Sequence, residues 1–405
     1  MIALAWRNLW RQPRRTLLTL AVIALAGMVT VFLLALQEGS YATMRNNTLS
    51  VFDGYAQVQQ PDYLDDPGIR RTISHPERLA RSIEQIDGVD AVALRGATYA
   101  LLSRDQHSVG AYVVGVQPKV EARVSSIARS LHEGRYLTPG NQAEVVVGQA
   151  LARNLGIGIG DSLTLLGMAR DGSVAADVLN VCGIFDSGVS TLDRQLVEIP
   201  LARFQTDFGM DGLANSLVVS GQGLTEVQDA LPTIRKRVET QGLAVRSWGE
   251  LEPGLQAAIR LDASTSMLWY ISLVIVVVVL LLNTLLMSVL ERTREFGVLL
   301  ALGMRDGAIG RMVWLELLLL LGLGLALGMA LGGGLALWYG IHGLALPGAE
   351  GVFAQWGLPS RMYTQLSAFS LFTGPAAIAL TTTLAGVFPY LRIRRLRPVP
   401  AMRAV

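Results

Sequence analysis

Charged residues are scarce in this chain. Only 16% of its 405 residues are charged, whereas 51% are hydrophobic, and the mean hydropathy is +0.41. Soluble domains carry about 25% charged residues, so the composition argues against an ordinary soluble protein and favours a membrane protein. Cysteine is almost absent as well. Cys182 is the only one, which excludes an intrachain disulfide and predicts a small, buried apolar residue.

Sequence motifs for catalysis are also missing. The only two lysines, Lys119 and Lys236, lie outside any Gly-Lys-Ser/Thr phosphate loop, so we expect no nucleotide-binding domain. The glycines within 155–161 follow a predicted helix and precede a predicted strand, the reverse of the order that a nucleotide loop requires. The four histidines are scattered, and no His-Glu-x-x-His or Gly-x-Ser-x-Gly pattern occurs. We therefore expect no catalytic residue, no cofactor site and no metal site, and no nucleic-acid partner.

Long uncharged runs are abundant instead. Leu17–Leu36 and Met267–Leu290 contain no charge and match the roughly 20 helical residues that cross a hydrocarbon core. Met312–Ile341 is apolar apart from Glu316, and Leu366–Leu391 is uncharged. The first run is too long for the core of a cleaved signal peptide, so we interpret it as an anchor that is retained. The sequence thus predicts four transmembrane helices.

The distribution of arginine predicts the orientation, because short flanks rich in basic residues stay on the cytoplasmic side. Four arginines precede the first span, four lie between the second and third spans, and five follow the fourth. Both termini and the second connection are therefore expected in the cytoplasm. The segment Glu38–Ser266 is expected outside, and its 27 acidic and 20 basic residues give it a negative charge.

This outer segment mixes short alternating strands with amphipathic helices, which predicts a folded α+β domain. Val89–Leu102 and Ser108–Val116 form a predicted hairpin. Ser74 and Glu77 match a capping box before a helix that runs toward residue 86, and a further helix is expected over 118–131. Strands and helices alternate similarly near both ends of the segment, so we expect these ends to fold together beside the membrane.

The predicted fold class is an α-helical membrane protein with four transmembrane helices and an α+β extracytoplasmic domain between the first two. In chain order, the predicted segments are a cytoplasmic interfacial helix (1–16), the first span (17–37), the extracytoplasmic domain (38–266, with a membrane-proximal lobe of about 38–116 and 221–266 and an outer lobe of about 117–220), the second span (267–290), a cytoplasmic helix and loop (291–311), the third span (312–341), a short outer loop (342–365), the fourth span (366–391) and a basic tail (392–405).

The third span carries glycines at four-residue intervals. Gly324, Gly328 and Gly332 share one helix face, where a second backbone can approach closely, so we expect them to pack against another helix. A strip along which a partner helix slides is the functional alternative. Glu316 lies near the cytoplasmic end of the same span, where it can reach the interface or pair with an arginine; a proton relay would need a second acid nearby.

The stretch from 291 to 304 directly follows the second span and is densely charged. A solvated interfacial loop would account for its charges but not for the apolar run from Phe296 to Leu302, which Gly303 ends. A short amphipathic helix at this place indicates a docking element for a cytoplasmic partner.

With this stretch the chain resembles the FtsX/MacB-type ABC transporter permeases (type VII, mechanotransmission), whose second span is followed by Glu-Arg-Thr-Arg-Glu and a glycine-terminated helix. Further similarity lies in 5–9 and 13–16 before the first span, in 145–148 and 155–161 of the outer domain, and in 400–403 of the tail. The similarity is closest to the lipoprotein-releasing LolC/LolE-like permeases.

The resemblance implies that the chain transmits movement to its outer domain rather than forming a channel for a solute. Two permease subunits, either a homodimer or this chain with a related one, would pair with two copies of a cytoplasmic ABC ATPase, which binds the ATP. Because only about 16 residues precede the first span, we expect that ATPase to be a separate chain. The residues implied to dock on it or to shape the docking helix are Glu291, Arg292, Thr293, Arg294, Glu295, Phe296, Gly297, Ala301, Leu302 and Gly303.

The resemblance leaves several functions open. The first is extraction of a lipoprotein or another hydrophobic substrate from the bacterial inner membrane, followed by transfer to a periplasmic lipoprotein carrier. The second is ATP-driven signalling to a periplasmic partner such as a cell-wall hydrolase or a sensor kinase. The third is a membrane-anchored binding or enzymatic domain that uses no ATPase.

Overall fold

The computed structural model describes residues 2–302, 304–345 and 361–388. The chain divides into two compact units. Residues 44–257 form the sheet unit, and the described residues of 2–43 and from 258 onward form the helical unit. Gly303, most of the predicted outer loop (346–360) and the basic tail (392–405) lie outside the described residues.

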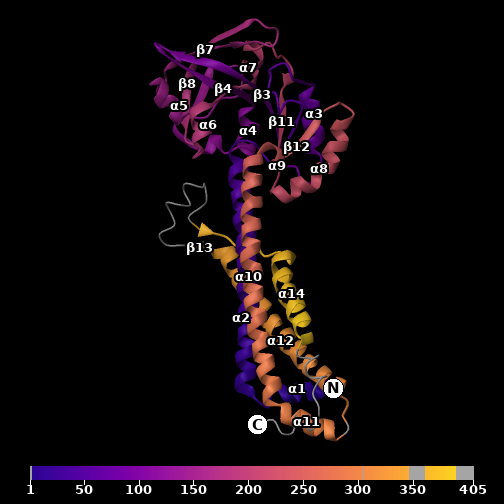
Figure 1. Cartoon of the computed structure of the whole chain (residues 1–405). Coiled ribbons are helices and arrows are strands. Elements are labelled where there is room, and N and C mark those ends of the chain that lie inside the picture. Colours follow the sequence, from indigo (N-terminus) through magenta and orange to yellow (C-terminus); the bar gives the residue numbers. More distant parts are fainter. Residues whose placement is uncertain (1, 303, 346–360, 389–405) are drawn as a thin grey trace. The chain divides into compact units, whose positions relative to one another are not determined.

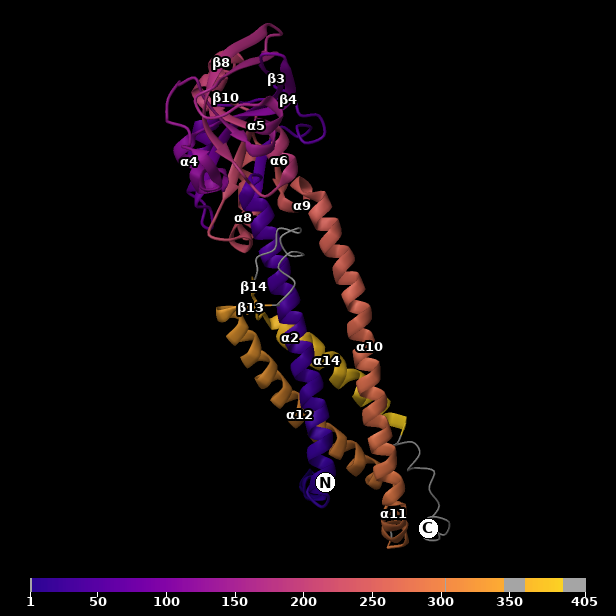
Figure 2. The ribbon, with the colours of Figure 1, turned by 90° about the vertical axis from the view of Figure 1, so that its left-hand side faces the viewer.

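The helical unit contains long helices (Figures 1 and 2). Four of the described helices are long and apolar enough to cross a membrane, in agreement with the four expected. The last residues of α2, from Met44, and the first of α10, up to Ala257, belong to the sheet unit. The elements are α1 (Ile2–Leu9), α2 (Pro13–Val51), α10 (Pro253–Glu291), α11 (Thr293–Ala301), α12 (Asp306–His342), β13 (Leu344–Ala345), β14 (Arg361–Met362) and α14 (Ala368–Ala385).

The first two spanning helices are longer than their apolar runs. Helix α2 continues 14 residues past the predicted end at 37, and α10 begins 14 residues before 267. Hydropathy marks where a helix leaves the hydrocarbon, whereas backbone signals decide where it stops. Pro253 suits the first turn of α10, and α2 ends just before Gly54, whose φ of +71° and N–H bond to the Leu49 carbonyl (2.9 Å) resemble a glycine C-cap.

The expected interfacial helix is shorter than predicted. Helix α1 ends at Leu9, and α2 already begins at Pro13, so the range 1–16 contains two helices and a turn. Proline at the first turn of α2 has no N–H to donate into the preceding turn, which explains the break.

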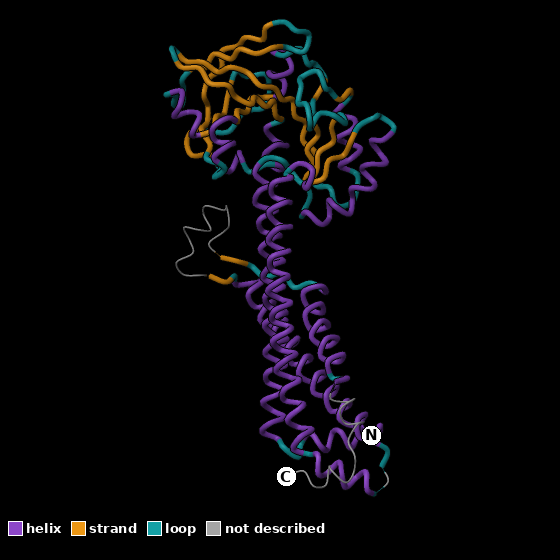
Figure 3. Tube along the Cα trace, in the orientation of Figure 1, coloured by secondary structure: helices purple, strands orange, loops and turns teal. Residues whose placement is uncertain are grey.

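In the sheet unit, strands and helices alternate in the α+β manner expected (Figure 3). The predicted hairpin corresponds to β3 and β4, which pair from Arg95↔Val116 to Arg104↔His107. The strands are β1 (Ala56–Gln59), β2 (Ile73–Ser74), β3 (Ala91–Arg104), β4 (His107–Val116), β5 (Leu131–Gly134), β6 (Glu144–Gly148), β7 (Ser162–Met168), β8 (Val174–Phe185), β9 (Leu196–Pro200), β10 (Leu213–Ala214), β11 (Ser216–Ser220) and β12 (Ala244–Ser247). The helices are α3 (Pro76–Glu84), α4 (Pro118–Val124), α5 (Gln149–Leu155), α6 (Ser190–Gln195), α7 (Leu201–Asp207), α8 (Leu224–Glu239) and α9 (Trp248–Leu251), with a 3₁₀ turn at Ile127–Arg129.

Ten of these strands form one mixed sheet, and nine of them follow the order β12-β1-β11-β3-β4-β9-β6-β8-β5. Strand β7 pairs with both β3 and β8, so part of the sheet closes on itself around a core that includes Leu102, Val113 and Val181. A second core lies where β1, β11 and β12 meet α3 and α8. Strand β11 belongs to this second core although it falls within the range expected for the outer lobe; the division into two lobes stays a prediction.

Two local predictions in the sheet unit are wrong. The cap of α3 is His75, in the left-handed conformation (φ 52°) with no side-chain capping bond, rather than Ser74. Ser74 is instead part of β2 and pairs with Leu213. The helix expected over 118–131 ends at Val124, because Ser125 adopts an extended conformation, and residues from 131 onward form β5.

Candidate functional site

Helix α11 is the predicted docking element, and a single residue, Arg292, separates it from α10. It starts at Thr293, one turn earlier than the apolar run suggested, and the N–H of Phe296 donates to the Arg292 carbonyl (3.0 Å). The N–H of Leu302 donates to the Val298 carbonyl (3.0 Å) and continues the pattern by one residue. The predicted end at Gly303 lies outside the described residues.

The side chain of Phe296 faces the interior of the helical unit. It is only 2% exposed and belongs to a cluster with Val289, Ile309, Met312 and Val313. Gly297 beside it is buried as well. Phe296 therefore holds α11 against the ends of α10 and α12, and its implied contact with the ATPase stays a prediction. The sequence pattern missed this because an apolar residue in a short helix fits either role.

The opposite face of α11 is open. Leu302 is 79% exposed and Val298 is 47% exposed. Arg294 and Ala301 are exposed too, and the spacing of 294, 298, 301 and 302 puts these residues on one face of the helix. Apolar side chains flanked by a charge are typical of a helix that lies in a groove of a partner protein.

A buried ion pair lies at the junction of α10, α11 and α12. The guanidinium of Arg292 donates to the carboxylate of Glu316 (Nη1–Oε2, 3.2 Å), and the two side chains are only 13% and 9% exposed. Asn8 of α1 donates to the same carboxylate (Nδ2–Oε1, 2.9 Å), and its carbonyl accepts from Arg292 (3.3 Å). Glu316 therefore joins α1, α12 and the residue before α11. Of the roles considered for Glu316, the structure supports the pairing with an arginine.

Two further pairs, which are more exposed, connect the start of α2 with α10 and the turn before α2 with α11. Arg15 donates to the carboxylate of Glu291 (2.7 Å) and to the Thr284 carbonyl (2.5 Å). Arg11 lies 3.6 Å from the carboxylate of Glu295. Exposed pairs of this kind contribute only about 0–1 kcal/mol each, whereas removal of one partner of a buried pair costs about 3–5 kcal/mol. Sequence reasoning missed Asn8 and Arg15. The only sign of them was that they lie in the stretches 5–9 and 13–16, which resemble the family.

The three glycines of α12 lie against α2. A Cβ added at Gly324 would be 2.6 Å from Cγ2 of Ile23, one at Gly328 would be 2.6 Å from the Ala24 carbonyl oxygen, and one at Gly332 would be 2.7 Å from the Met28 carbonyl oxygen. These separations are shorter than real Cβ contacts. The strip is therefore a place of close backbone approach between two helices.

We expect Gly328→Ala to lower the thermal stability of the purified protein in detergent, because the added methyl forces α12 away from α2. Overpacking of this kind costs about 1–3 kcal/mol. Gly334→Ala is the matched control: nothing lies within 4 Å of its added Cβ, and alanine favours a helix by about 0.5–1 kcal/mol. Equal melting temperatures for the two variants would contradict the close approach.

The acidic, histidine and cysteine side chains offer no candidate metal centre in the described part of the chain. Among the residues that the structure describes, no group of three or more His, Cys, Asp or Glu side chains could hold a metal ion. Cys182 is buried, and burial raises the pKa of its thiol to about 11, which leaves little thiolate at neutral pH.

Family models match nearly the whole chain. The model described as "MacB-like periplasmic core domain" matches residues 16–235, and the one described as "FtsX-like permease C-terminal" matches 267–398. The chain is similar to the lipoprotein-releasing system transmembrane protein LolC of Xylella fastidiosa, with 25% identity over 89% of this chain and 90% of the relative. It is also similar to LolC of Neisseria meningitidis, with 22% identity over 74% of this chain and 72% of the relative. The solved periplasmic region of MacB from Actinobacillus actinomycetemcomitans aligns over 52% of this chain and 96% of that chain, with 10% identity and a TM-score of 0.39.

Proposed function

Because this chain belongs to the family of ABC transporter permeases with a MacB-like periplasmic core domain and an FtsX-like C-terminal part, we propose that it couples ATP hydrolysis by a separate ATPase to movement of its periplasmic domain. In this proposal two cytoplasmic ABC ATPase subunits bind the ATP. Two permease subunits, identical or related, complete the complex. The chain lies in the bacterial inner membrane with both termini in the cytoplasm.

The observation that carries the proposal is the division of α11 into a held face and an open face. Phe296 and the Arg292–Glu316 pair fix the helix to α10 and α12. Leu302 and Val298 remain free to enter a groove, and Arg294 provides a charge beside them. A docking helix has to be rigid toward its own chain and exposed toward its partner, because force passes only through a stiff connection. A few central, well-packed residues commonly dominate the binding energy of such contacts.

We expect Leu302→Asp to lower the amount of ABC ATPase recovered with the affinity-purified chain at least tenfold. Full burial of a leucine side chain contributes about 1.5–3 kcal/mol, and a desolvated carboxylate adds a further penalty. ATPase recovery is measured by mass spectrometry of the purified complex. Val174→Asp is the control, because it introduces the same carboxylate at another exposed apolar residue. Val174 is 76% exposed and lies in the sheet unit, far from Leu302 in the sequence. If wild-type protein brings down no ABC ATPase, the proposed coupling is wrong.

We further propose release of lipoproteins or another hydrophobic substrate from the inner membrane, with a periplasmic carrier as the recipient. The similarity to two proteins of lipoprotein-releasing systems supports this substrate class. After depletion of the chain, we expect lipoproteins to accumulate in the inner membrane, as measured by fractionation and mass spectrometry. Unchanged lipoprotein distribution together with altered activity of a cell-wall hydrolase or a sensor kinase would favour signalling instead.

A further inference from the structure

A fully buried arginine lies in the sheet unit, at the end of the first spanning helix. Arg95 of β3 is 2% exposed, and its guanidinium donates to the carboxylate of Glu121 in α4 (Nε–Oε2, 3.2 Å; Nη2–Oε1, 2.5 Å). Glu121 is 0% exposed. Charged side chains are almost never buried to this extent unless they are paired, so the position of this pair requires an explanation.

The same guanidinium reaches the end of α2. It donates to the carbonyl of Phe52 (2.7 Å), the residue after the last one of the helix, and lies 3.9 Å from the centroid of the Phe52 ring. The N–H of Ser126 donates to the neighbouring Ser50 carbonyl (2.8 Å). The last carbonyls of a helix have no partner within it and carry a partial negative charge. A cation and a backbone donor from the sheet unit therefore complete this helix end.

The beginning of α10 is joined to the same place. Asp53 follows Phe52, Glu252 directly precedes α10, and the two carboxyl groups hydrogen-bond to each other. Burial raises the pKa of Glu252 to about 7 and also raises the pKa of Asp53. One proton shared by two carboxyl groups allows such a contact, whereas two ionised groups would repel. The end of α2 and the start of α10 are thus linked to each other as well as to the sheet.

A third carboxyl group nearby does not compete for Arg95. Glu198 of β9 is 0% exposed and accepts a hydrogen bond from the Tyr136 hydroxyl (2.6 Å). Burial, together with the nearby Glu121, raises the pKa of Glu198 to about 8, so this group is mostly protonated at neutral pH. Arg95 therefore bonds to the carboxyl group of Glu121 and uses another N–H for the helix end.

We propose that Arg95 is a positioning residue that fastens the end of α2 to the sheet and, with the Asp53–Glu252 contact, forms the joint through which movement of α2 and α10 reaches the periplasmic domain. The inference rests on the proposed function. A purely stabilising role explains less, because apolar residues of similar volume commonly stabilise a core as well as a buried ion pair does. The bond to a helix-end carbonyl is what an apolar pair cannot replace.

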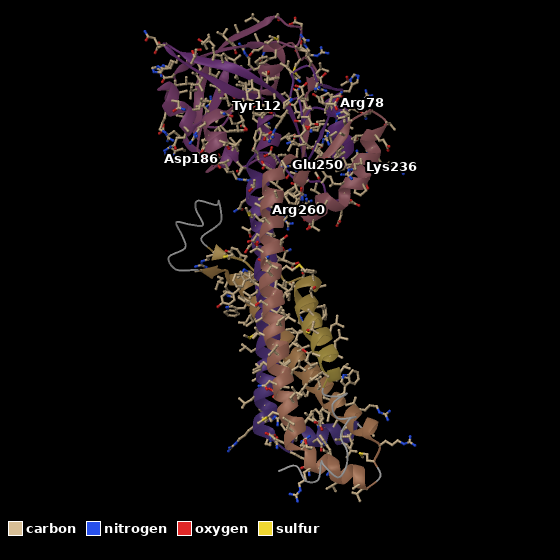
Figure 4. The ribbon with its side chains drawn as sticks, viewed as in Figure 1. Arg78, Tyr112, Asp186, Lys236, Glu250 and Arg260 are labelled. Atoms are coloured by element: carbon tan, nitrogen blue, oxygen red, sulfur yellow. The ribbon has the colours of Figure 1, made fainter. Side chains whose placement is uncertain are left out.

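The test uses the full chain with its ATPase in lipid vesicles, in a Cys182→Ala background. Spin labels at Lys236→Cys on α8 (Figure 4) and His342→Cys report the distance between the two units without nucleotide and after trapping with ATP and vanadate. Wild-type protein is expected to show a nucleotide-dependent change in this distance. In the double variant Arg95→Met with Glu121→Met, the change should fall to less than half, while ATPase recovery and ATP hydrolysis stay within twofold of wild type.

Labels at Asp186→Cys and Lys236→Cys, both in the sheet unit (Figure 4), provide the folding control. Their separation should be the same in wild type and variant. If the double variant does not fold, Arg95→Lys replaces it, because lysine lacks the planar fork that bonds Glu121 and the Phe52 carbonyl together, and the same loss is expected. A full distance change in a folded variant would overturn this inference alone. If wild-type protein brings down no ATPase, or if its label distance does not change with nucleotide, the proposed function is wrong, and the inference is wrong with it.

Discussion

Glu316→Ala should be among the most damaging single substitutions in the described part of the helical unit. It leaves the guanidinium of Arg292, whose side chain is 13% exposed, without its carboxylate and removes the acceptor of the Asn8 amide. Removing one partner of a buried pair typically costs about 3–5 kcal/mol. We expect a clear fall in the melting temperature of the purified protein and a loosened contact between α11 and the turn that joins α1 to α2.

The loosened contact can be measured directly by cross-linking. In the Cys182→Ala background, cysteines are placed at Arg11 and Glu295, whose charged groups lie 3.6 Å apart, and a flexible bismaleimide should readily form a cross-link between them. Adding Glu316→Ala should slow its formation at least fivefold. Glu38→Ala is the matched control, because it removes another carboxylate of the helical unit, one that accepts from Ser367 (2.5 Å). An equal rate in both backgrounds would show that Glu316 does not position α11.

A neutral pair separates the geometry from the charge. Glu316→Gln with Arg292→Gln removes both charges while it keeps side chains that can hydrogen-bond. Much of the lost stability should return in this double variant, since the principal penalty in Glu316→Ala is an uncompensated buried charge. If the double variant is no more stable than Glu316→Ala, the geometry of the hydrogen bonds, rather than the balance of charge, determines the stability of this junction.

The sequence predicted the elements that leave a pattern over many consecutive residues. Four apolar runs indicated the four candidate spans, and strand alternation indicated the hairpin of β3 and β4. Helix ends were predicted less well. Hydropathy carries no information about a helix that continues into water, so α2 and α10 were expected to be shorter. At Ser74 a capping signal was overridden by pairing with Leu213, a contact between residues far apart in the chain.

The candidate site shows the same limit. The position and helical character of α11 were predictable, because charge density and an apolar run are local features. The partners of its residues were not. Arg292 meets a carboxylate 24 positions away and an asparagine 284 positions away, and Arg95 meets Glu121 and Phe52 on other elements. Local pattern shows that a charge exists but not whether it is buried.

We expect Phe296→Ala to loosen the contact of α11 with α10 and α12, whereas Leu302→Asp should leave α11 in place. Truncation of a buried phenylalanine costs about 3–5 kcal/mol, and the lost contacts with Ile309 and Val313 are those that seat the helix. Amide hydrogen exchange over 293–301 should therefore rise at least tenfold in Phe296→Ala and stay unchanged in Leu302→Asp, while ATPase recovery falls in both. If Phe296→Ala lowers ATPase recovery with unchanged exchange, the ring contacts the partner directly, as the sequence pattern had suggested. Faster exchange in Phe296→Ala alone would show that the two faces of α11 have separate tasks, one toward its own chain and one toward the ATPase.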